Sequence, residues 1–370
     1  MEYRFYIGTK VIFGKNCVFA SRQELEKLGK RAFIVCGRNS ARASGALKDV
    51  AGILEEAGIA YEIYDNVENN PTLENVADAG CLASRFRADC IIGIGGGSPL
   101  DAAKAVAVLA VNEIEPVELY SGSFKKKPLP IIAIPTTAGT GSEVTPYSIL
   151  TRKDLRTKMS FGSEELFPRV AFLDARYTES MSYDTTVDTA VDAFSHAVEG
   201  YLSKRSTPVS DVLAVEAVSL FGQCIEPLLE GKIDFSVREK LLHASMLGGM
   251  VISHTGTTLV HSLGYSLTYF KSVPHGRANG VFMKEYLLFN YEYAKEKIDN
   301  IFKLLGIKDT EEFGDIMDRL AFIKRDYSED EIKLYASLAI KQKGPSYNIR
   351  NVCSEDLFDI MKRSLLSKRL

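Results

Sequence analysis

The stretch Cys90-Ile91-Ile92-Gly93-Ile94-Gly95-Gly96-Gly97-Ser98-Pro99 decides the fold of the first half of the chain. Its apolar beginning has the profile of a buried strand in a parallel sheet. The glycines and the proline lead into a helical pattern over residues 100–111, and a proline at the first position of a helix costs no hydrogen bond. A strand that passes through a glycine-rich turn into a helix indicates an α/β unit.

The same alternation of strand and helix extends to both sides of this unit. Further strands are expected over residues 31–36, 61–65, 131–134 and 172–174, and further helices over residues 47–56 and 73–86, the last with Thr72 as its N-cap. This alternation predicts a parallel sheet with both faces covered by helices. In such sheets, ligands bind beyond the carboxyl ends of the strands.

Two polar loops follow strands at those ends. In the first loop, backbone N–H groups could approach a phosphate beside a helix N-terminus; its candidate residues are Gly95, Gly96, Gly97, Ser98 and Asp101. The second loop offers hydroxyl groups suited to phosphate or ribose oxygens, on Thr136, Thr137, Thr140, Ser142 and Thr145. The plainer alternatives are a turn that only needs a positive φ and a hydroxyl-rich surface loop.

The second half of the chain has a helical pattern instead. Helices are expected over residues 185–202 (capped by Ser182 or Asp184), 211–229, 236–252, 256–267 and through most of 285–369. We therefore expect an α/β domain over residues 1–180 and an all-α domain over residues 181–370. A cleft between two such domains is the default position for an active site.

Three of the five histidines lie in two short segments of this second half. Asp192 and His196 are four residues apart, so they project from one side of the expected helix and can chelate a divalent metal. We interpret Asp192, His196, His261 and His275 as the four protein ligands of one metal ion. Alone, an Asp-x-x-x-His pair is more often a surface pair or a core residue, and Pro274-His275-Gly276 can be an exposed turn.

Two other histidines need an interpretation as well. His254 competes as a ligand because it lies seven residues, or about two helical turns, before His261. We favour the plainer interpretation, in which His254 belongs to the wall of the cleft. His243 is expected to be an ordinary helix residue and receives no role.

Composition excludes several classes of protein. The chain has 370 residues, 46% hydrophobic and 25% charged, as in a globular enzyme, and its net charge of −3 offers no basic face for nucleic acid. Six scattered cysteines without a CxxC spacing fit a reducing compartment. The N-terminus is unlike a secretory signal, and no apolar run has the length of a membrane span. We expect a cytoplasmic enzyme that binds neither nucleic acid nor membranes.

Four motifs, in the right order, resemble those of the iron-containing (group III) alcohol dehydrogenases: Gly95 to Lys104, Pro135 to Glu143, Asp192 to Glu199, and Pro274 to Gly276. The resemblance covers nearly the whole chain. It implies a dinucleotide-binding N-terminal domain of Rossmann type and an all-α C-terminal domain that holds the metal. The metal ligands it implies are Asp192, His196, His261 and His275. It further implies Fe²⁺ as the usual metal, with Zn²⁺ in some relatives, and a homodimer.

The chain departs from the family pattern in two places. Members often carry a second histidine four residues after the third ligand, where this chain has Tyr265, so a proton relay through that histidine is in doubt. An aspartate that often follows the first strand and favours NAD is replaced by Gly37, with Arg38, Asn39 and Ser40 after it. Because Gly37 leaves room and Arg38 can pair with a 2′-phosphate, we expect NADP to be preferred over NAD.

The expected activity is reversible hydride transfer between a small primary alcohol or diol and NAD(P), with the metal as a Lewis acid. Residues expected to hold the dinucleotide are Asn70, Ser98, Thr137, Ser142 and Lys158, although Lys158 could be a plain surface lysine. The nearest alternative is a glycerol dehydrogenase-like polyol oxidoreductase that uses zinc and NAD. A dehydroquinate-synthase-like cyclase is disfavoured because residues 256–260 carry no charge for a phosphorylated substrate. A nucleotide-binding sensor without turnover would not need four metal ligands.

Overall fold

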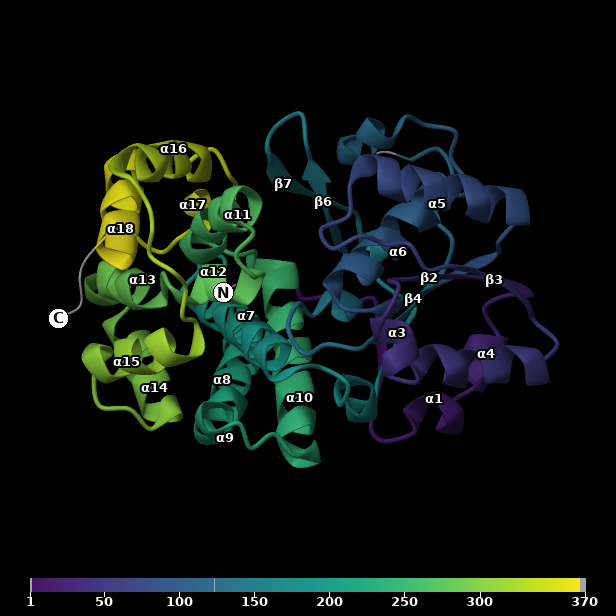
Figure 1. Ribbon diagram of the computed structural model, residues 1–370, viewed down its shortest axis with the longest axis horizontal. Helices are drawn as coiled ribbons and strands as arrows, with labels where there is room; N and C mark the ends of the chain where they lie inside the picture. The colour runs from purple at the N-terminus through teal and green to yellow at the C-terminus, as the bar shows by residue number, and fades with distance from the viewer. Residues whose placement is uncertain (1, 123, 367–370) are drawn as a thin grey trace. The chain divides into compact units, whose positions relative to one another are not determined.

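The computed structural model describes residues 2–122 and 124–366. These residues form two compact units: one is Tyr6–Met181, and the other consists of the residues before Tyr6 and those from Ser182 onward. In Figure 1 the first unit runs from purple to teal and contains strands β1 to β8, whereas the second runs to yellow and is helical. The expected fold class, a parallel α/β region followed by a helical region, is confirmed.

The first unit is organised around a parallel sheet. Its six strands lie in the order β1-β8-β5-β4-β2-β3, and each neighbouring pair runs parallel. Their bounds are β1 Lys10–Phe13, β2 Arg31–Cys36, β3 Ala60–Tyr64, β4 Cys90–Gly95, β5 Ile131–Pro135 and β8 Val170–Leu173. After β2 the chain adds β3 on one side and β4 on the other. The strand order therefore reverses between β2 and β4, which is where ligands bind in open α/β sheets.

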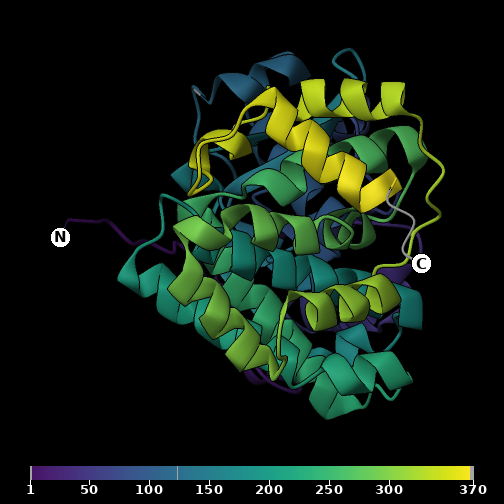
Figure 2. The same ribbon diagram turned by 90° about the vertical axis from the view of Figure 1, so that its left-hand side faces the viewer.

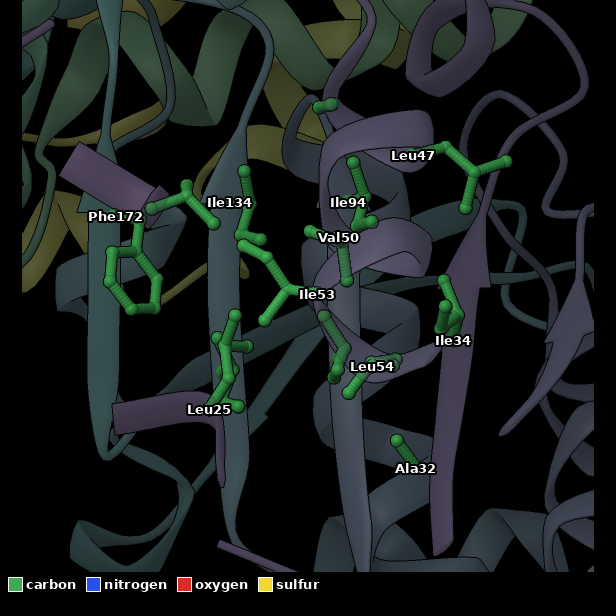
Figure 3. Close-up of a cluster of buried hydrophobic side chains, with 14 of the residues drawn as sticks. Leu25, Ala32, Ile34, Leu47, Val50, Ile53, Leu54, Ile94, Ile134 and Phe172 are labelled. Carbon is green, nitrogen blue, oxygen red and sulfur yellow. The ribbon is translucent and has the colours of Figure 1, made fainter. Parts of the chain in front are cut away.

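The central strands β2, β4, β5 and β8 are buried on both faces, because successive side chains enter two different hydrophobic clusters. Along β2, Ala32 and Ile34 belong to one cluster, whereas Phe33 and Val35 belong to the other. Figure 3 shows the first cluster, in which apolar side chains of α4 lie over the strands. The helices that contribute to it are α1 Cys17–Ala20, α2 Gln23–Glu26, α3 Ser40–Ala43 and α4 Ala46–Glu56.

The second cluster lies under α5 (Leu73–Phe86) and α6 (Gly97–Leu109). Thr72 caps α5 as expected, since its side chain accepts a hydrogen bond from the Asn75 N–H. The sheet and α6 approach closely: a methyl group placed on Gly93 would lie 2.9 Å from the Cβ of Ala103. This contact fixes α6, and with it the glycine-rich turn from which α6 starts.

The helical unit is built around α7 (Tyr183–Tyr201), which packs against α8, α10 and α12. Ser182 caps α7 by accepting a hydrogen bond from the Thr185 N–H. In Figure 2, where this unit faces the viewer, the yellow helices α16 and α18 lie side by side. The other helices are α8 Pro208–Gly222, α9 Ile225–Glu230, α10 Phe235–Thr255, α11 Leu259–Lys271, α12 His275–Gly280, α13 Met283–Asn290, α14 Lys295–Leu305, α15 Thr310–Leu320, α16 Glu329–Ala339, α17 Gly344–Tyr347 and α18 Ser354–Leu366.

Some helix boundaries differ from those predicted. Helix α6 begins at Gly97 rather than at residue 100, because Pro99 fits inside the first turn, where its missing N–H is not penalised. The helix expected over residues 211–229 is divided into α8 and α9. Helix α11 begins at Leu259 rather than at residue 256, since Gly256 has a φ of +68° and ends α10.

Three strands were not predicted. Strand β1 is only half-buried, and the antiparallel hairpin of β6 (Tyr147–Arg152) and β7 (Thr157–Gly162) has a largely exposed second strand. None of the three has the continuous apolar run by which the central strands were recognised.

The stretch Pro208–Glu230 is long and apolar enough to cross a membrane, judged by length and composition alone. It comprises α8 and α9, and α8 packs against α7 and α10 within the helical unit.

The contact between α12 and α7 generates a stability prediction. A methyl group on Gly276 would lie 1.7 Å from the backbone oxygen of Asp188, so the two helices must separate in a Gly276→Ala variant. We expect this variant to lose roughly 3 kcal/mol of unfolding free energy, measured by urea denaturation. As a control, Gly52→Ala in α4 meets no atom within 4 Å and should be neutral or stabilising by up to about 1 kcal/mol. Equal effects of the two substitutions would contradict the close packing of α12.

Candidate metal centre

One oxygen of a buried carboxylate is the hub of a cluster of imidazoles. Asp192 Oδ1 lies 3.4 Å from the Nε2 atom of His261, 3.7 Å from that of His275 and 4.0 Å from that of His196. The side chains come from three helices: Asp192 and His196 from α7, His261 from α11, and His275 from the first position of α12. Helical spacing on α7 thus puts an oxygen and a nitrogen on one side, and α11 and α12 bring the other two nitrogens to it.

The donor set fits a divalent cation. Four ligand atoms at about 2.0–2.2 Å from a tetrahedral metal are separated from one another by about 3.3–3.6 Å. Ligand atoms of Asp192, His261 and His275 all lie within 4.8 Å of one another. His196 reaches Asp192 but lies outside this mutually close group, although its ring stacks on that of His261 at a centroid distance of 4.5 Å. The structure therefore brings together a compact group of three with the fourth predicted ligand at its edge.

Neighbouring imidazoles keep Asp192 in its ionised form, the form that can bind a metal. Burial alone would raise the pKa of Asp192, but the imidazoles of His196, His275 and His261 outweigh it and hold that pKa well below its usual range. Burial alone would lower the pKa of His261, yet the carboxylates of Glu199 and Asp192 raise it to about 9. The two carboxylates thus favour a positive charge in this group, which a metal cation would supply.

Asn279 is a residue of this group that the sequence did not reveal. Its Nδ2 atom lies 3.0 Å from Asp192 Oδ1, 3.2 Å from His261 Nε2 and 3.4 Å from His275 Nε2. Asn279 is fully buried, and its Oδ1 atom has no hydrogen-bond partner among the residues that the structure describes. Its position four residues after His275 on α12 was the available signal, because residues four apart on a helix share a face.

Tyr265 and His254 lie in different surroundings. The ring of Tyr265 stacks on that of His275, with centroids 5.6 Å apart and planes at 10°. The ring of His254 stacks on Phe5, with centroids 4.0 Å apart, and its Nδ1 atom lies 3.0 Å from the Met250 oxygen. Neither His254 nor His243 belongs to a metal-compatible group among the described residues.

The two polar loops of the first unit are in contact. A methyl group on Gly97 would lie 2.6 Å from the Cγ2 atom of Thr140, and one on Gly96 would lie 3.1 Å from Thr137. Gly95 has a φ of +148° and accepts a hydrogen bond from the Thr136 N–H through its own carbonyl. Only glycine permits this approach, so the glycines allow the first loop to lie directly against the second.

Other predicted cofactor residues lie around these loops. The Asn70 N–H donates to the Ser98 hydroxyl at 3.1 Å. Gly37 directly follows β2, and the Nε atom of the exposed Arg38 donates to Asn66 Oδ1 at 2.9 Å. Asn39 and Ser40 form the start of α3, and Lys158 lies on β7 opposite Thr151.

Three of the predicted cofactor residues are tied into a buried network instead of lying open. Lys104 Nζ donates to the hydroxyls of Ser142, at 2.7 Å, and Thr145, at 3.1 Å. Asp101 accepts from the Ser142 hydroxyl at 2.5 Å and from the Ile149 N–H at 3.0 Å. Burial lowers the pKa of Lys104 to about 8. The network joins α6 to the second loop and so fixes the two loops relative to each other.

Comparison with known proteins points to one family. Residues 8–175 match the family model for iron-containing alcohol dehydrogenase, and residues 186–365 match the C-terminal model of the Fe-containing alcohol dehydrogenase family. Lactaldehyde reductase of Escherichia coli is 32% identical over 83% of this chain and 81% of its own length. The NADPH-dependent butanol dehydrogenase of Clostridium saccharobutylicum is 31% identical over 82% and 78%. A crystal structure of an iron-containing alcohol dehydrogenase from Thermotoga maritima has a TM-score of 0.92 and 39% identity, covering 99% and 100% of the two chains.

The buried acid beside the Lys104 network generates a pH prediction. Burial raises the pKa of Glu143 from 4.5 to about 7, so between these values the folded protein retains a proton that the unfolded chain has released. Wild-type stability should therefore fall as the pH rises through this window, by at most about 3 kcal/mol. Glu143→Gln carries no such proton.

The measurement is the difference in unfolding free energy between Glu143→Gln and the wild type from pH 4 to 7.5. As the pH rises, the unfolding free energy of Glu143→Gln should increase relative to that of the wild type. Lys104, whose pKa is about 8, stays protonated over most of this range and contributes a nearly constant offset. A difference that does not change with pH would contradict the raised pKa.

Proposed function

This chain belongs to the iron-containing alcohol dehydrogenase family, and on that basis we propose that it catalyses reversible hydride transfer between a small primary alcohol or diol and NAD(P), with NADP preferred. The observation that carries the proposal is the group of buried donors around Asp192 Oδ1. These donors suit a single divalent cation, which would supply Lewis acidity to the oxygen of an alcohol or aldehyde.

We propose Asp192, His196, His261 and His275 as the ligands, with Fe²⁺ as the metal and Zn²⁺ as the alternative. One carboxylate offsets half the charge of a divalent ion, which leaves the ion electrophilic. The side chains of Asp192, His196 and His261 are 3–6% exposed, whereas that of His275 is 25% exposed. Substrate access is therefore proposed to be at His275, beside the ring of Tyr265.

The dinucleotide is proposed to bind the first unit at the carboxyl ends of β2 and β4, between which the strand order reverses. The Gly95–Gly97 turn lies at the carboxyl end of β4 and starts α6, so its N–H groups and the helix N-terminus suit a pyrophosphate. Ser98, Asn70, Thr136, Thr137 and Lys158 are proposed to contact the cofactor. Ser142, Thr145 and Asp101 would act mainly by fixing the loops, because their polar atoms bond to the Lys104 network.

NADP preference is proposed from the segment after β2. A side chain at Gly37 would meet only ordinary contacts, 3.6 Å from the Val67 oxygen and 4.0 Å from Pro99. Position 37 could thus hold a side chain, and with glycine there we propose that a 2′-phosphate takes this place and pairs with the exposed Arg38. The cytoplasmic location and the homodimer stay predictions.

Metal content and activity should be lost together in a His275→Ala variant. We expect about one metal ion per chain in wild-type protein purified without oxygen, and far less in His275→Ala. Activity is followed by absorbance of the reduced nicotinamide, with small primary alcohols and diols and both cofactors. His254→Ala is the matched control, because His254 stacks on Phe5 and lies outside the metal-compatible group, so it should keep metal and activity. A metal-free His275→Ala that remains active would refute the proposed function.

Cofactor preference is tested by the ratio of kcat/KM for NADP to that for NAD. A Gly37→Asp variant puts a carboxylate where it repels a 2′-phosphate and can bond a ribose hydroxyl, so the ratio should fall by at least about tenfold. Arg38→Ala removes a charge-assisted hydrogen bond and should lower kcat/KM for NADP by about 10- to 100-fold. The NAD value in Arg38→Ala should change little. A wild-type enzyme that prefers NAD would show this assignment to be wrong.

A further inference from the structure

Glu199 is a buried carboxylate that the metal ligands do not account for. It lies on α7 one turn beyond His196, and it is fully buried. A buried charge is costly unless hydrogen bonds compensate for it. Both oxygens of Glu199 are engaged, and each faces a different kind of donor.

The Oε1 atom of Glu199 accepts hydrogen bonds from the beginning of α11. It receives the N–H of Thr258 at 2.8 Å and that of Val260 at 2.9 Å, together with the Thr258 hydroxyl at 2.9 Å. The first N–H groups of a helix have no partner within the helix, and the N-cap Thr258 provides no side-chain cap of its own. Glu199 therefore caps α11 from another helix, at the end where negative charge is favourable.

The Oε2 atom of Glu199 accepts a hydrogen bond from the Nδ1 atom of His261. An imidazole that donates from Nδ1 presents the lone pair of Nε2, and that Nε2 lies 3.4 Å from Asp192 Oδ1. Since metal-binding histidines are commonly held by a carboxylate on their other nitrogen, this contact selects the form of His261 that can bind the cation.

We propose that Glu199 is a positioning residue that selects the Nε2-binding tautomer of His261 and, through its other oxygen, fixes the start of the helix that carries His261. The assignment rests on the metal centre of the proposed function. Metal affinity and the position of α11 are then coupled through one carboxylate. The Thr258 hydroxyl extends the arrangement to Tyr286, whose hydroxyl lies 3.0 Å away.

A Glu199→Gln variant can fill only one of the two roles at a time, because an amide has one accepting oxygen and one donating nitrogen. With the oxygen toward α11, the amide nitrogen faces Nδ1 of His261, and the ring proton must move to Nε2, where it blocks the metal. With the oxygen toward His261, the amide nitrogen opposes the N–H groups at the start of α11. Both orientations weaken the site, and we expect Zn²⁺ affinity to fall about 10- to 100-fold in chelator competition.

The control variants leave the carboxylate in place. Thr258→Val removes one hydroxyl from the cap but keeps the two N–H donors and the bond to His261, so it should lower thermal stability and cost less Zn²⁺ affinity than Glu199→Gln does. Thr186→Val removes a buried hydroxyl on α7 that bonds to the Ser182 oxygen, remote in sequence from Glu199. It should leave Zn²⁺ affinity unchanged.

A spectroscopic measurement keeps the test independent of folding in the variants. The measurement is ¹⁵N NMR of zinc-loaded wild-type protein with ¹⁵N-labelled histidine. Because the chain has only five histidines, the spectrum contains few ring-nitrogen signals to assign. His261 should show a protonated Nδ1 and a metal-bound Nε2. Coordination through Nδ1, or a Glu199→Gln variant that binds Zn²⁺ as tightly as the wild type, would overturn the assignment. A wild-type protein that binds no Zn²⁺ or Fe²⁺ would instead overturn the proposed function and this assignment together.

Discussion

The helical unit depends on holding one carboxylate oxygen within reach of three imidazoles that come from three helices. Asp192 Oδ1 has the Nε2 atoms of His196, His261 and His275 within 4.0 Å, so α7, α11 and α12 must approach closely. Small residues make this possible. A methyl group on Gly276 would meet the α7 backbone, and one on Gly264 would lie 2.2 Å from Asn279 Oδ1. The glycines are therefore a consequence of the site's geometry.

In the first unit, a buried lysine holds two segments of the chain together through hydrogen bonds. Lys104 and Asp101 lie on α6 and bind the hydroxyls of Ser142 and Thr145 in the following loop. Hydrogen bonds in such a network offset the free-energy cost of removing its polar groups from water only when nearly all of these groups have partners. Here the network fixes the second loop against the turn at Gly95–Gly97. The hydroxyls of Ser142 and Thr145 could have bound a ligand, but they hold the loop backbone in place instead.

The sequence predicted most of the central architecture because the relevant signals are local. A continuous apolar run marks β2 and β4, and spacing on one helix places Asp192 with His196. The edge strand β1 and the β6–β7 hairpin lack such a run. The roles of Asn279 and Glu199 were not predicted, for a different reason. They come from contacts between α7, α11 and α12, and the local sequence does not indicate which distant helix a buried polar residue contacts. The hydrogen bond from Lys104 to the Ser142 hydroxyl was not predicted for the same reason.

Tyr265 shows how a departure from the family pattern can preserve packing while changing chemistry. Its ring stacks on His275 and meets His261 edge-on at 6.4 Å, so an aromatic ring still supports both imidazoles. An imidazole has two ring nitrogens and can accept a proton at one while it donates from the other, whereas a phenol has a single hydroxyl. The support that the ring gives to the ligands and the transfer of a proton are therefore separate functions. The packing at position 265 preserves the first, and in the proposed reaction we expect the second to fall to another group.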